Sequence, residues 1–487
     1  MRRIPVAARW CALAAVLNAL VWSFVTPPFE VPDETVHVTY VQSLAEDGQI
    51  PNDPGAGVFS REQAELMVAL QFNTVVGRPR DRAIVSDLQE GSVDALTQNP
   101  PDKSHPGGTT ETSSQPPLYY GLEALVYQVS PWRNLLDRLW LMRAFSALLA
   151  GVTVLFVFMF LRELLPEPWM WTVGALAVAF QPVFGFIAGG VSADNLLFAA
   201  SAALFFALAR TFNRGLTLHH GLAIGAALAV GALAKLNFLA LVPGALLGVA
   251  LLLWRDRRRE GRQAWRGAAA ALGIPALFGA LYVALNLVAW DRSAWGGGVE
   301  TASRAAAGED SGAHAITVAE QLSYTWQLYL PRLPFMNDQF AYFPPWQSWF
   351  KGGIGLFGWL DTPFDGWVYT LAALLAVPIV VLALVALVRH RAALRARLLE
   401  LVTYAAIVGG LLLSVGLLGL RYRLDTGSAF EQFRYLLPFA ALYGAAIALA
   451  AVGAGRRLSR PVGAALVVLA LAHGLFAQLL VIGRFYG

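Results

Sequence analysis

Residues 27–40, PPFEVPDETVHVTY, follow directly on the first apolar segment and contain three acidic residues and a histidine. Pro32 favours a sharp turn followed by a new helix, which would place Asp33 and His37 four residues apart on one face, with Glu34 beside them. Two carboxylates and an imidazole can act as a general base or bind a hard divalent cation. The alternative is a solvated helix start, where the helix dipole favours acidic side chains.

Three basic residues are candidates for binding a phosphate group. Arg434, in EQFRYLLPFAAL, stands at the start of a late apolar segment, Lys235 separates two short apolar segments, and Arg143 lies in the second long one. Guanidinium and ammonium groups hold a phosphate by charge-assisted hydrogen bonds. Two alternatives stay open: Arg434 can pair with Glu431, and Arg143 can extend to the membrane surface.

Polar and aromatic residues near these charges are candidates for contacts with a substrate. In SSQPPLYYGLEAL, Gln115 begins a QPP run that favours an extended backbone, and Tyr119 follows as the chain returns toward the membrane. Tyr435 comes directly after the arginine of EQFRYLLPFAAL. In GGVSADNLL, Ser192 or Asp194 is expected to cap the N-terminus of a helix.

The composition is that of an integral membrane protein. Of 487 residues, 57% are hydrophobic and 14% are charged, and the apolar residues gather in runs as long as a membrane-spanning helix. Cys11 is the only cysteine, which excludes an intrachain disulfide. We expect an all-α polytopic fold, one membrane domain over residues 1–487, with eleven spanning helices at about 7–26, 138–161, 169–190, 193–212, 219–234, 237–254, 267–290, 367–388, 399–420, 434–454 and 461–483.

The arginines assign a side of the membrane to each connection. They concentrate at the N-terminus, in WRDRRREGR (254–262) and in other short connections, all of which fall on one side of an eleven-helix chain. That side is expected to be cytoplasmic, with the N-terminus inside and the C-terminus outside. The first segment lacks a small-x-small cleavage site and is interpreted as a retained helix. The two long connections, 27–137 and 291–366, are then expected to be extracytoplasmic.

Five short stretches, PPFEVPDETVH, QPPLYY, VSADN, FGWLDTPF and EQFRYLLP, occur in this order along the polytopic chain. In this arrangement the chain resembles the bacterial DUF2142 family of membrane proteins, from about residue 25 to residue 438. That family in turn resembles the GT-C superfamily of membrane glycosyltransferases, which includes oligosaccharyltransferases, protein mannosyltransferases and aminoarabinose transferases. The resemblance implies a GT-C-like helical bundle with two long extracytoplasmic loops.

The resemblance also implies roles for the residues. In those relatives an Asp or Glu of the first outer loop is the catalytic base for the acceptor, or binds a metal, and the donor is a sugar on polyprenyl phosphate or pyrophosphate. Carried over, Asp33 is expected as the base, Glu34 is second, and His37 supports them. PDE stands here in place of the spaced DxD of some members, which leaves open whether Asp33 and Glu34 bind a divalent cation, Mg²⁺ or Mn²⁺. The residues expected to bind the donor phosphate or substrate are Arg434, Lys235, Arg143, Gln115, Tyr119 and Tyr435.

We therefore expect a glycosyltransferase of the bacterial plasma membrane that moves a sugar from a polyprenyl-phosphate donor to a cell-envelope glycan or lipid acceptor on the outer face. Its expected partners are the lipid-linked donor, the acceptor and membrane lipids. The basic connections are typical of topology signals, and nucleic acid is not an expected partner. Two other classes stay open: a transporter or flippase of lipid-linked glycans, which would carry broken helices, and a non-catalytic envelope scaffold.

Overall fold

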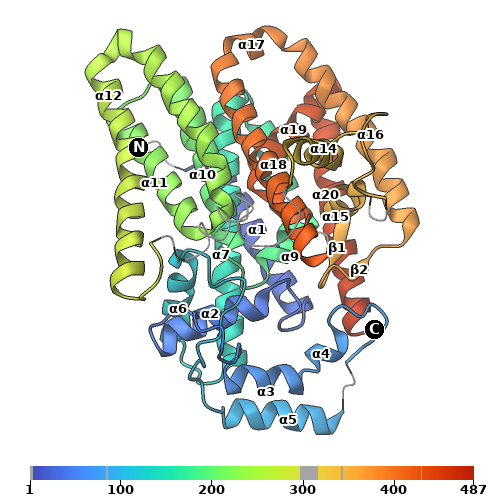
Figure 1. Ribbon diagram of the computed structural model, residues 1–487. Coiled ribbons are helices and arrows are strands. Elements are labelled where there is room, and N and C mark those ends of the chain that lie inside the picture. Colours follow the sequence, from blue (N-terminus) through green and yellow to red (C-terminus); the bar gives the residue numbers. More distant parts are fainter. Residues whose placement is uncertain (1–3, 84–85, 295, 297–315, 342–343, 429) are drawn as a thin grey trace.

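The computed structural model describes residues 4–83, 86–294, 296, 316–341, 344–428 and 430–487. Within these residues the fold is a bundle of helices, and the sole strand pair is the two-residue ladder of β1 (Leu356–Phe357) and β2 (Thr362–Pro363). The expected all-α polytopic membrane fold is confirmed (Figure 1).

Nine helices in the described part of the chain are long and apolar enough to cross a membrane, or ten if one bent pair counts as a span. Helix α11 (Leu218–Ala234) is apolar but shorter. Together these helices account for all eleven predicted segments. The nine are α1 (Val6–Val25), α7 (Leu135–Leu164), α10 (Asp194–Arg214), the two halves Leu236–Arg258 and Gly261–Val288, α16 (Gly366–Arg389), α18 (Leu398–Thr426), the η3/α19 span (Phe433–Gly453) and α20 (Ser459–Phe485).

The predicted span over residues 169–190 is helical, but it is broken into two helices. The chain forms α8 (Pro168–Ala179) and α9 (Pro182–Ala188), which are bent by 61° relative to each other. Pro182 cannot donate a backbone hydrogen bond and restricts the residue before it, so the first helix ends there. Gln181 then caps the second helix, because its Oε1 accepts a hydrogen bond from the Phe184 backbone N at 2.5 Å.

The predicted turn at Lys235 is present. Helix α11 ends at Ala234, Lys235 is extended, and the 3₁₀ helix η1 (Leu236–Leu241) leads into α12 (Val242–Val288). The two spans within α12 meet at the top of Figure 1. Glycines bring neighbouring helices close together: a Cβ on Gly174 of α8 would lie 2.4 Å from the carbonyl oxygen of Gly444 in α19.

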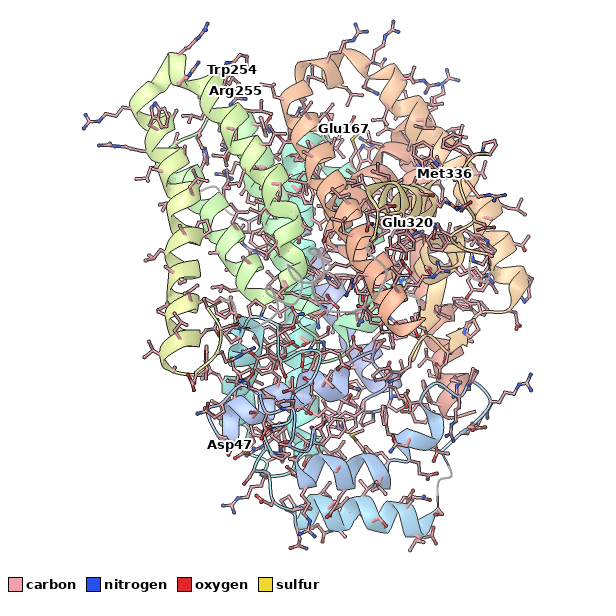
Figure 2. The ribbon with its side chains drawn as sticks, viewed as in Figure 1. Asp47, Glu167, Trp254, Arg255, Glu320 and Met336 are labelled. Carbon is pink, nitrogen blue, oxygen red and sulfur yellow. The ribbon has the colours of Figure 1, made fainter. Side chains whose placement is uncertain are left out.

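The short, arginine-rich connections and the first long loop lie at opposite ends of the bundle. Figure 2 shows Trp254, Arg255 and Glu167 at one end and Asp47, in the first loop, at the other. Helix α17 (Arg391–Ala396) lies at the same end as Arg255 (Figure 1). The two sets of connections are therefore separated as the arginine pattern predicts.

The first long loop folds into a layer of helices, which packs against the end of the bundle opposite Arg255. Its buried aliphatic and aromatic residues form a cluster that continues into α7 and includes Phe29, Tyr40, Tyr120 and Leu139. Amphipathic segments that bury one face in this way need a partner layer, and α7 supplies it. The helices of the layer are α2 (Glu34–Glu46), α3 (Arg61–Ala69), α4 (Phe72–Val75), α5 (Asp87–Gln98) and α6 (Leu118–Val129).

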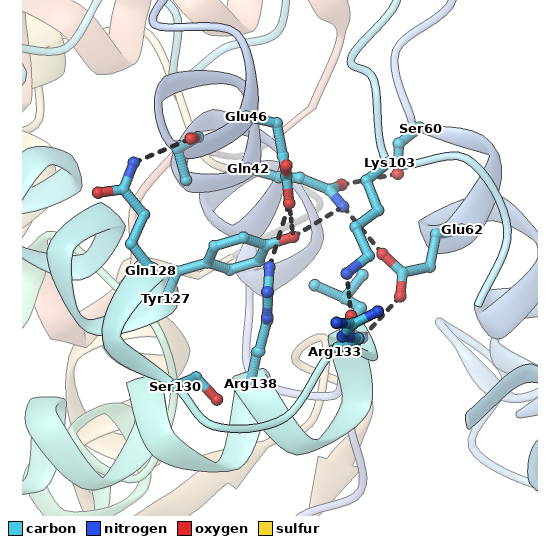
Figure 3. A network of polar contacts seen from close by, with 12 residues as sticks. Gln42, Glu46, Ser60, Glu62, Lys103, Tyr127, Gln128, Ser130, Arg133 and Arg138 are labelled. Atoms are coloured by element: carbon cyan, nitrogen blue, oxygen red, sulfur yellow. Dashed lines mark hydrogen bonds and ion pairs between the residues drawn. The ribbon is translucent and has the colours of Figure 1, made fainter. Parts of the chain in front are cut away.

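A polar network anchors α2 to α6 and α7 (Figure 3). The Tyr127 hydroxyl donates to Glu46 at 2.7 Å, and Arg138 donates to the same carboxylate at 3.1 Å. Gln42 donates to Glu62 at 3.2 Å. These partly buried hydrogen bonds connect the second half of α2 to its neighbours and so help to fix the position of the helix.

The second long loop packs along the bundle and ends in a small hairpin. Helix α14 (Val318–Tyr329) begins with a capping box between Thr317 and Glu320 and contacts α18. A π-helical turn (Gln347–Lys351) and α15 (Gly352–Gly355) lead into β1 and β2, which carry the FGWLDTPF stretch. The Tyr369 hydroxyl donates to the Gly355 carbonyl at 2.7 Å, which fixes the hairpin on α16.

Candidate functional site

Asp33 is the residue before α2 and adopts a left-handed conformation, with φ 65°. This conformation is costly for a residue other than glycine, and such strain is concentrated at functional sites. The Asp33 side chain accepts no capping hydrogen bond from α2. Its Oδ2 instead lies 2.5 Å from Nη2 of Arg434. The side chain is 37% exposed, so the carboxylate faces solvent on one side and Arg434 on the other.

Arg434 opens the 3₁₀ helix η3 (Phe433–Phe439) at the start of a membrane span. Its side chain is only 6% exposed, and its Nε has no hydrogen-bond partner. The guanidinium lies 5.5 Å from the centre of the half-buried Tyr435 ring. The alternative partner, Glu431, instead accepts a hydrogen bond from the Tyr324 hydroxyl. Arg434 is therefore a buried cation that retains one unused donor.

A second ion pair lies behind the first. Nζ of Lys235 donates to Oδ1 of Asp194 at 2.8 Å, and Oδ2 of Asp194 is 4.0 Å from Nη1 of Arg434. Asp194 does not cap α10, whose preceding residue is Ala193, whereas Oγ of Ser192 accepts a hydrogen bond from the backbone N of Asp194 at 3.3 Å. An ammonium is a stronger partner for the buried Asp194 carboxylate than a backbone N–H, which explains the difference. Sequence reasoning missed Asp194 as a site residue.

His37 lies on α2 near these charges. Its Nδ1 is 2.9 Å from the Tyr120 hydroxyl, and Tyr120 stacks on Tyr40 with ring centres 3.8 Å apart. Burial and the Lys235 ammonium lower the pKa of His37 to about 3. The imidazole is therefore neutral at physiological pH, and it is 2% exposed.

The ionisation of Asp33 follows from its neighbours. Burial raises the pKa of Asp33, but the Arg434 guanidinium, His37 and Lys235 together outweigh this effect and lower the pKa to about 2. We refer to Asp33, Asp194, Lys235 and Arg434 as the Asp33 cluster. Its two carboxylates balance its two cations, and the neutral His37 lies beside it. An anion that binds at Arg434 would therefore give the cluster a net negative charge and would compete with Asp33 for the guanidinium.

Glu34 and Arg143 form a different, fully buried ion pair with side chains 0% exposed. The Glu34 carboxylate accepts from Arg143 at 2.5 Å and also from the backbone N of Phe29 and Val191. Arg143 further donates to the carbonyls of Ser23, Thr26 and Pro27. The structure thus brings these two candidates to each other, and their contacts fix the chain that leads from α1 into α2.

The remaining candidates divide between two places. Oε1 of Gln115 accepts from the backbone N of Leu236 at 3.0 Å, which puts Gln115 beside Lys235. Tyr119 is fully buried against Tyr120, with ring centres 5.6 Å apart, and its hydroxyl donates to Glu123 at 2.9 Å and lies 2.9 Å from Ser146. The Tyr119 hydroxyl is therefore engaged by Glu123 and Ser146, whereas Tyr435 lies beside Arg434 and Gln115 beside Lys235.

A resident divalent cation does not fit the carboxylates expected to bind it. Asp33 accepts from Arg434 and Glu34 accepts from Arg143, so each carboxylate already faces a guanidinium. No group of three or more His, Cys, Asp or Glu side chains arranged for a metal occurs in the described residues. Mg²⁺ and Mn²⁺ prefer several unpaired oxygen ligands, and the site as folded does not supply them.

Comparison with known proteins identifies the family of the chain. A search of curated proteins found no match. The model of the DUF2142 family, described as a predicted membrane protein, matches residues 16–443. This range includes the second half of α1, the first long loop, Asp194, Lys235 and Arg434, and therefore every residue of the cluster around Asp33. The chain belongs to the DUF2142 family of predicted membrane proteins.

Proposed function

We propose that the protein is a glycosyltransferase of the bacterial plasma membrane, which moves a sugar from a polyprenyl-phosphate donor to a glycan or lipid acceptor of the cell envelope. The observation that carries this proposal is the partly exposed Asp33 carboxylate 2.5 Å from the buried Arg434, with Lys235 and Asp194 behind them. The first long loop and this cluster would face the outside, as the arginine pattern predicts.

The chemistry needs a base for the acceptor hydroxyl and a cation for the departing phosphate. Asp33 would take the proton of the hydroxyl, while Arg434 stabilises the negative charge that grows on the phosphate oxygen. Arg434 is suited to this role because its Nε has no hydrogen-bond partner and can donate to a phosphate oxygen.

A pKa of about 2 makes Asp33 a weak base while it is paired with Arg434. An anionic phosphate bound at Arg434 would compete with Asp33 for the guanidinium and add a nearby negative charge. Both changes raise the pKa of a carboxylate. Donor binding would therefore release Asp33 and strengthen it as a base, so that proton removal depends on the presence of the donor.

The purified protein in lipid nanodiscs tests the proposal when it is incubated with polyprenyl-phosphate sugars and glycans extracted from cell envelopes. Mass spectrometry of the lipids should detect free polyprenyl phosphate, together with an acceptor heavier by one sugar. A complete envelope extract that yields neither product, with protein that remains folded, would contradict the proposal.

A second candidate is a transporter or flippase of lipid-linked glycans. The bend of 61° between α8 and α9 and the Lys235–Asp194 pair beside the α11–η1 break favour it, because broken helices with charges at the break are typical of transporters. Vesicles with a fluorescent lipid-linked sugar in one leaflet separate the two candidates. A flippase equilibrates the label without cleaving the phosphate–sugar bond, whereas a transferase releases polyprenyl phosphate.

A further inference from the structure

A cavity of about 300 Å³ lies between the β1–β2 hairpin and the C-terminal end of α20. Its polar lining includes Asp361, Thr362 and Arg484, and its apolar lining includes Pro363, Leu479 and Leu480. This volume is at the lower end of the range, about 300–1,000 Å³, of small-molecule sites. The cavity is built from FGWLDTPF, a stretch that the proposed base and phosphate ligands leave without a role.

Buried polar atoms without partners gather at this cavity. Asp361 is 8% exposed, and its Oδ2 has no hydrogen-bond partner, although its Oδ1 accepts from Thr362 at 3.0 Å. Arg484 is 8% exposed, and its Nε is also unpaired, while its other nitrogens donate to backbone carbonyls that include that of Asp81. Buried polar groups tend to be satisfied, so a ligand that offers both a donor and an acceptor fits the unpaired oxygen of Asp361 and the unpaired nitrogen of Arg484.

Glu30, in PPFEVPDE, is a third buried residue that has a polar atom without a partner. It is 3% exposed, and its Oε2 has no partner. Burial and the neighbouring Asp361 raise the pKa of Glu30 to about 8, while Arg484 opposes this rise. Glu30 is therefore close enough to both residues to feel their charges, and at pH 7 it is mainly a neutral acid that can donate as well as accept.

The charges and hydrogen-bonding capacity of Asp361 and Arg484 indicate which class of ligand the cavity can bind. Asp361 and Arg484 carry opposite formal charges, so neither a divalent cation nor a phosphate ion gains a net attraction from the lining. Hydroxyl groups fit, because each can donate to Asp361 and accept from Arg484. The leucines of α20 supply an apolar wall for the C–H face of such a molecule.

We propose that this cavity binds one sugar ring of the acceptor. The proposal rests on the proposed function, because it identifies the acceptor as a saccharide. Glu30, which lies near Asp361 and Arg484, stands three residues before Asp33, so the chain that carries the base passes beside the residues around the cavity. The ring can belong to a free glycan or to a lipid-linked one, since Leu479 and Leu480 stand where the cavity meets a membrane span.

Saturation-transfer-difference NMR tests the proposal with protein in nanodiscs, free of glycoside detergent. The probes are the methyl glycosides of glucose, galactose, mannose, arabinose and N-acetylglucosamine, and octyl glucoside as the lipid-linked form. Gly483 lines the cavity, and a Cβ there would meet no atom within 4 Å, so Gly483→Leu adds its side chain from a backbone position that has room for a Cβ and should occupy the cavity. Gly279→Leu, at an equally open glycine of α12, is the matched control.

We expect ring-proton signals from at least one glycoside with the wild type and with Gly279→Leu, and loss of these signals with Gly483→Leu. Asp361→Asn, which keeps the size of the side chain, should reduce the signals as well. An octyl signal without any methyl signal assigns the ring to a lipid-linked acceptor. No ring signal from any probe, or equal signals from the wild type and a folded Gly483→Leu variant, would overturn the proposal.

The readout is binding, so it is independent of turnover. Asp33→Asn should bind the same glycosides, because Asp33 does not line the cavity. If Asp33→Asn retained both glycoside binding and full transfer activity, the proposed role of Asp33 as the base would be contradicted, but the proposed sugar site would not. If Gly483→Leu did not affect glycoside binding and Asp33→Asn abolished transfer, only the proposed sugar site would be contradicted.

Discussion

The carboxylate of Asp33 and the guanidinium of Arg434 are 2.5 Å apart, although 401 positions separate the two residues in the chain. Asp33 lies between α1 and α2, near the start of the first long loop. Arg434 lies at the start of the span that contains α19. Their contact therefore joins the two ends of the matched family region. It also places a partly exposed acid next to a buried cation that has an unused donor.

Replacing Arg434 should weaken phosphate binding. Arg434→Ala removes charge-assisted hydrogen bonds, each worth about 1.5–3 kcal/mol, so the Kd for polyprenyl phosphate should rise about 10- to 100-fold at low salt. The loss should shrink at high salt because ions screen the remaining attraction. Native mass spectrometry or a fluorescence titration measures the Kd. Arg391→Ala, at an exposed arginine of α17, is the control, and equal Kd values for all three proteins would exclude Arg434 as a phosphate ligand.

Lys235 should matter for stability before it matters for binding. Lys235→Met leaves the Asp194 carboxylate, 1% exposed, without its closest cation, and breaking a buried pair costs about 3–5 kcal/mol. The double variant Lys235→Met/Asp194→Asn should recover part of that loss, because no unpaired charge remains. Thermal unfolding in detergent measures both effects, with Arg460→Met, from an exposed pair with Glu167, as the control. A single variant as stable as the wild type would show that the pair is not closed in solution.

Glu123 should make stability depend on pH. Burial raises the pKa of Glu123 to about 8, above the usual value of 4.5, so the folded protein retains this proton where the unfolded chain has lost it. The contribution to the free energy of unfolding is full below about pH 4.5 and declines as pH rises through about 8. Glu30 adds a contribution of the same sign.

Glu123→Gln mimics the protonated acid and should reduce the fall in melting temperature between pH 5 and pH 9 without abolishing it. Glu90→Gln, at an exposed glutamate of α5, should leave the pH profile unchanged. Melting temperatures in buffers of matched ionic strength give the comparison. A Glu123→Gln profile as steep as that of the wild type would mean that Glu123 is ionised in the folded protein.

Part of this structure can be predicted from the sequence because membrane spans depend on local hydropathy and length. All eleven predicted segments are helical, and Asp33, His37, Lys235 and Arg434 stand out as charges at the ends of those segments. The bend at Gln181–Pro182 also had a local signal, the proline inside an apolar run, which was not used. By contrast, the pairings are set by tertiary packing, and no local pattern reports them. The sequence around Asp194 therefore resembles a helix cap, and nothing near Arg143 in the sequence indicates its pairing with Glu34.

The assignment of the first long loop to the outside can be tested in intact cells. After Cys11 is replaced, a cysteine at exposed Ser92 in α5 should react with a membrane-impermeant maleimide, whereas one at exposed Arg257 should react only after the membrane is permeabilised. The reason is that the two positions lie at opposite ends of the bundle. Labelling in the reverse order would invert the topology and move the Asp33 cluster to the cytoplasmic side.

The central claim concerns Asp33, and its substitution tests that claim most directly. A positioned general base contributes about 10²- to 10⁴-fold to a rate. Asp425→Asn is a matched control, since Asp425 also pairs with an arginine, Arg421, at 3.0 Å, and its side chain is 43% exposed. The rate at which polyprenyl phosphate is released should be compared at equal amounts of folded protein. We predict at least a 100-fold lower rate for Asp33→Asn and an unchanged rate for Asp425→Asn. Release by Asp33→Asn at the wild-type rate would contradict the account.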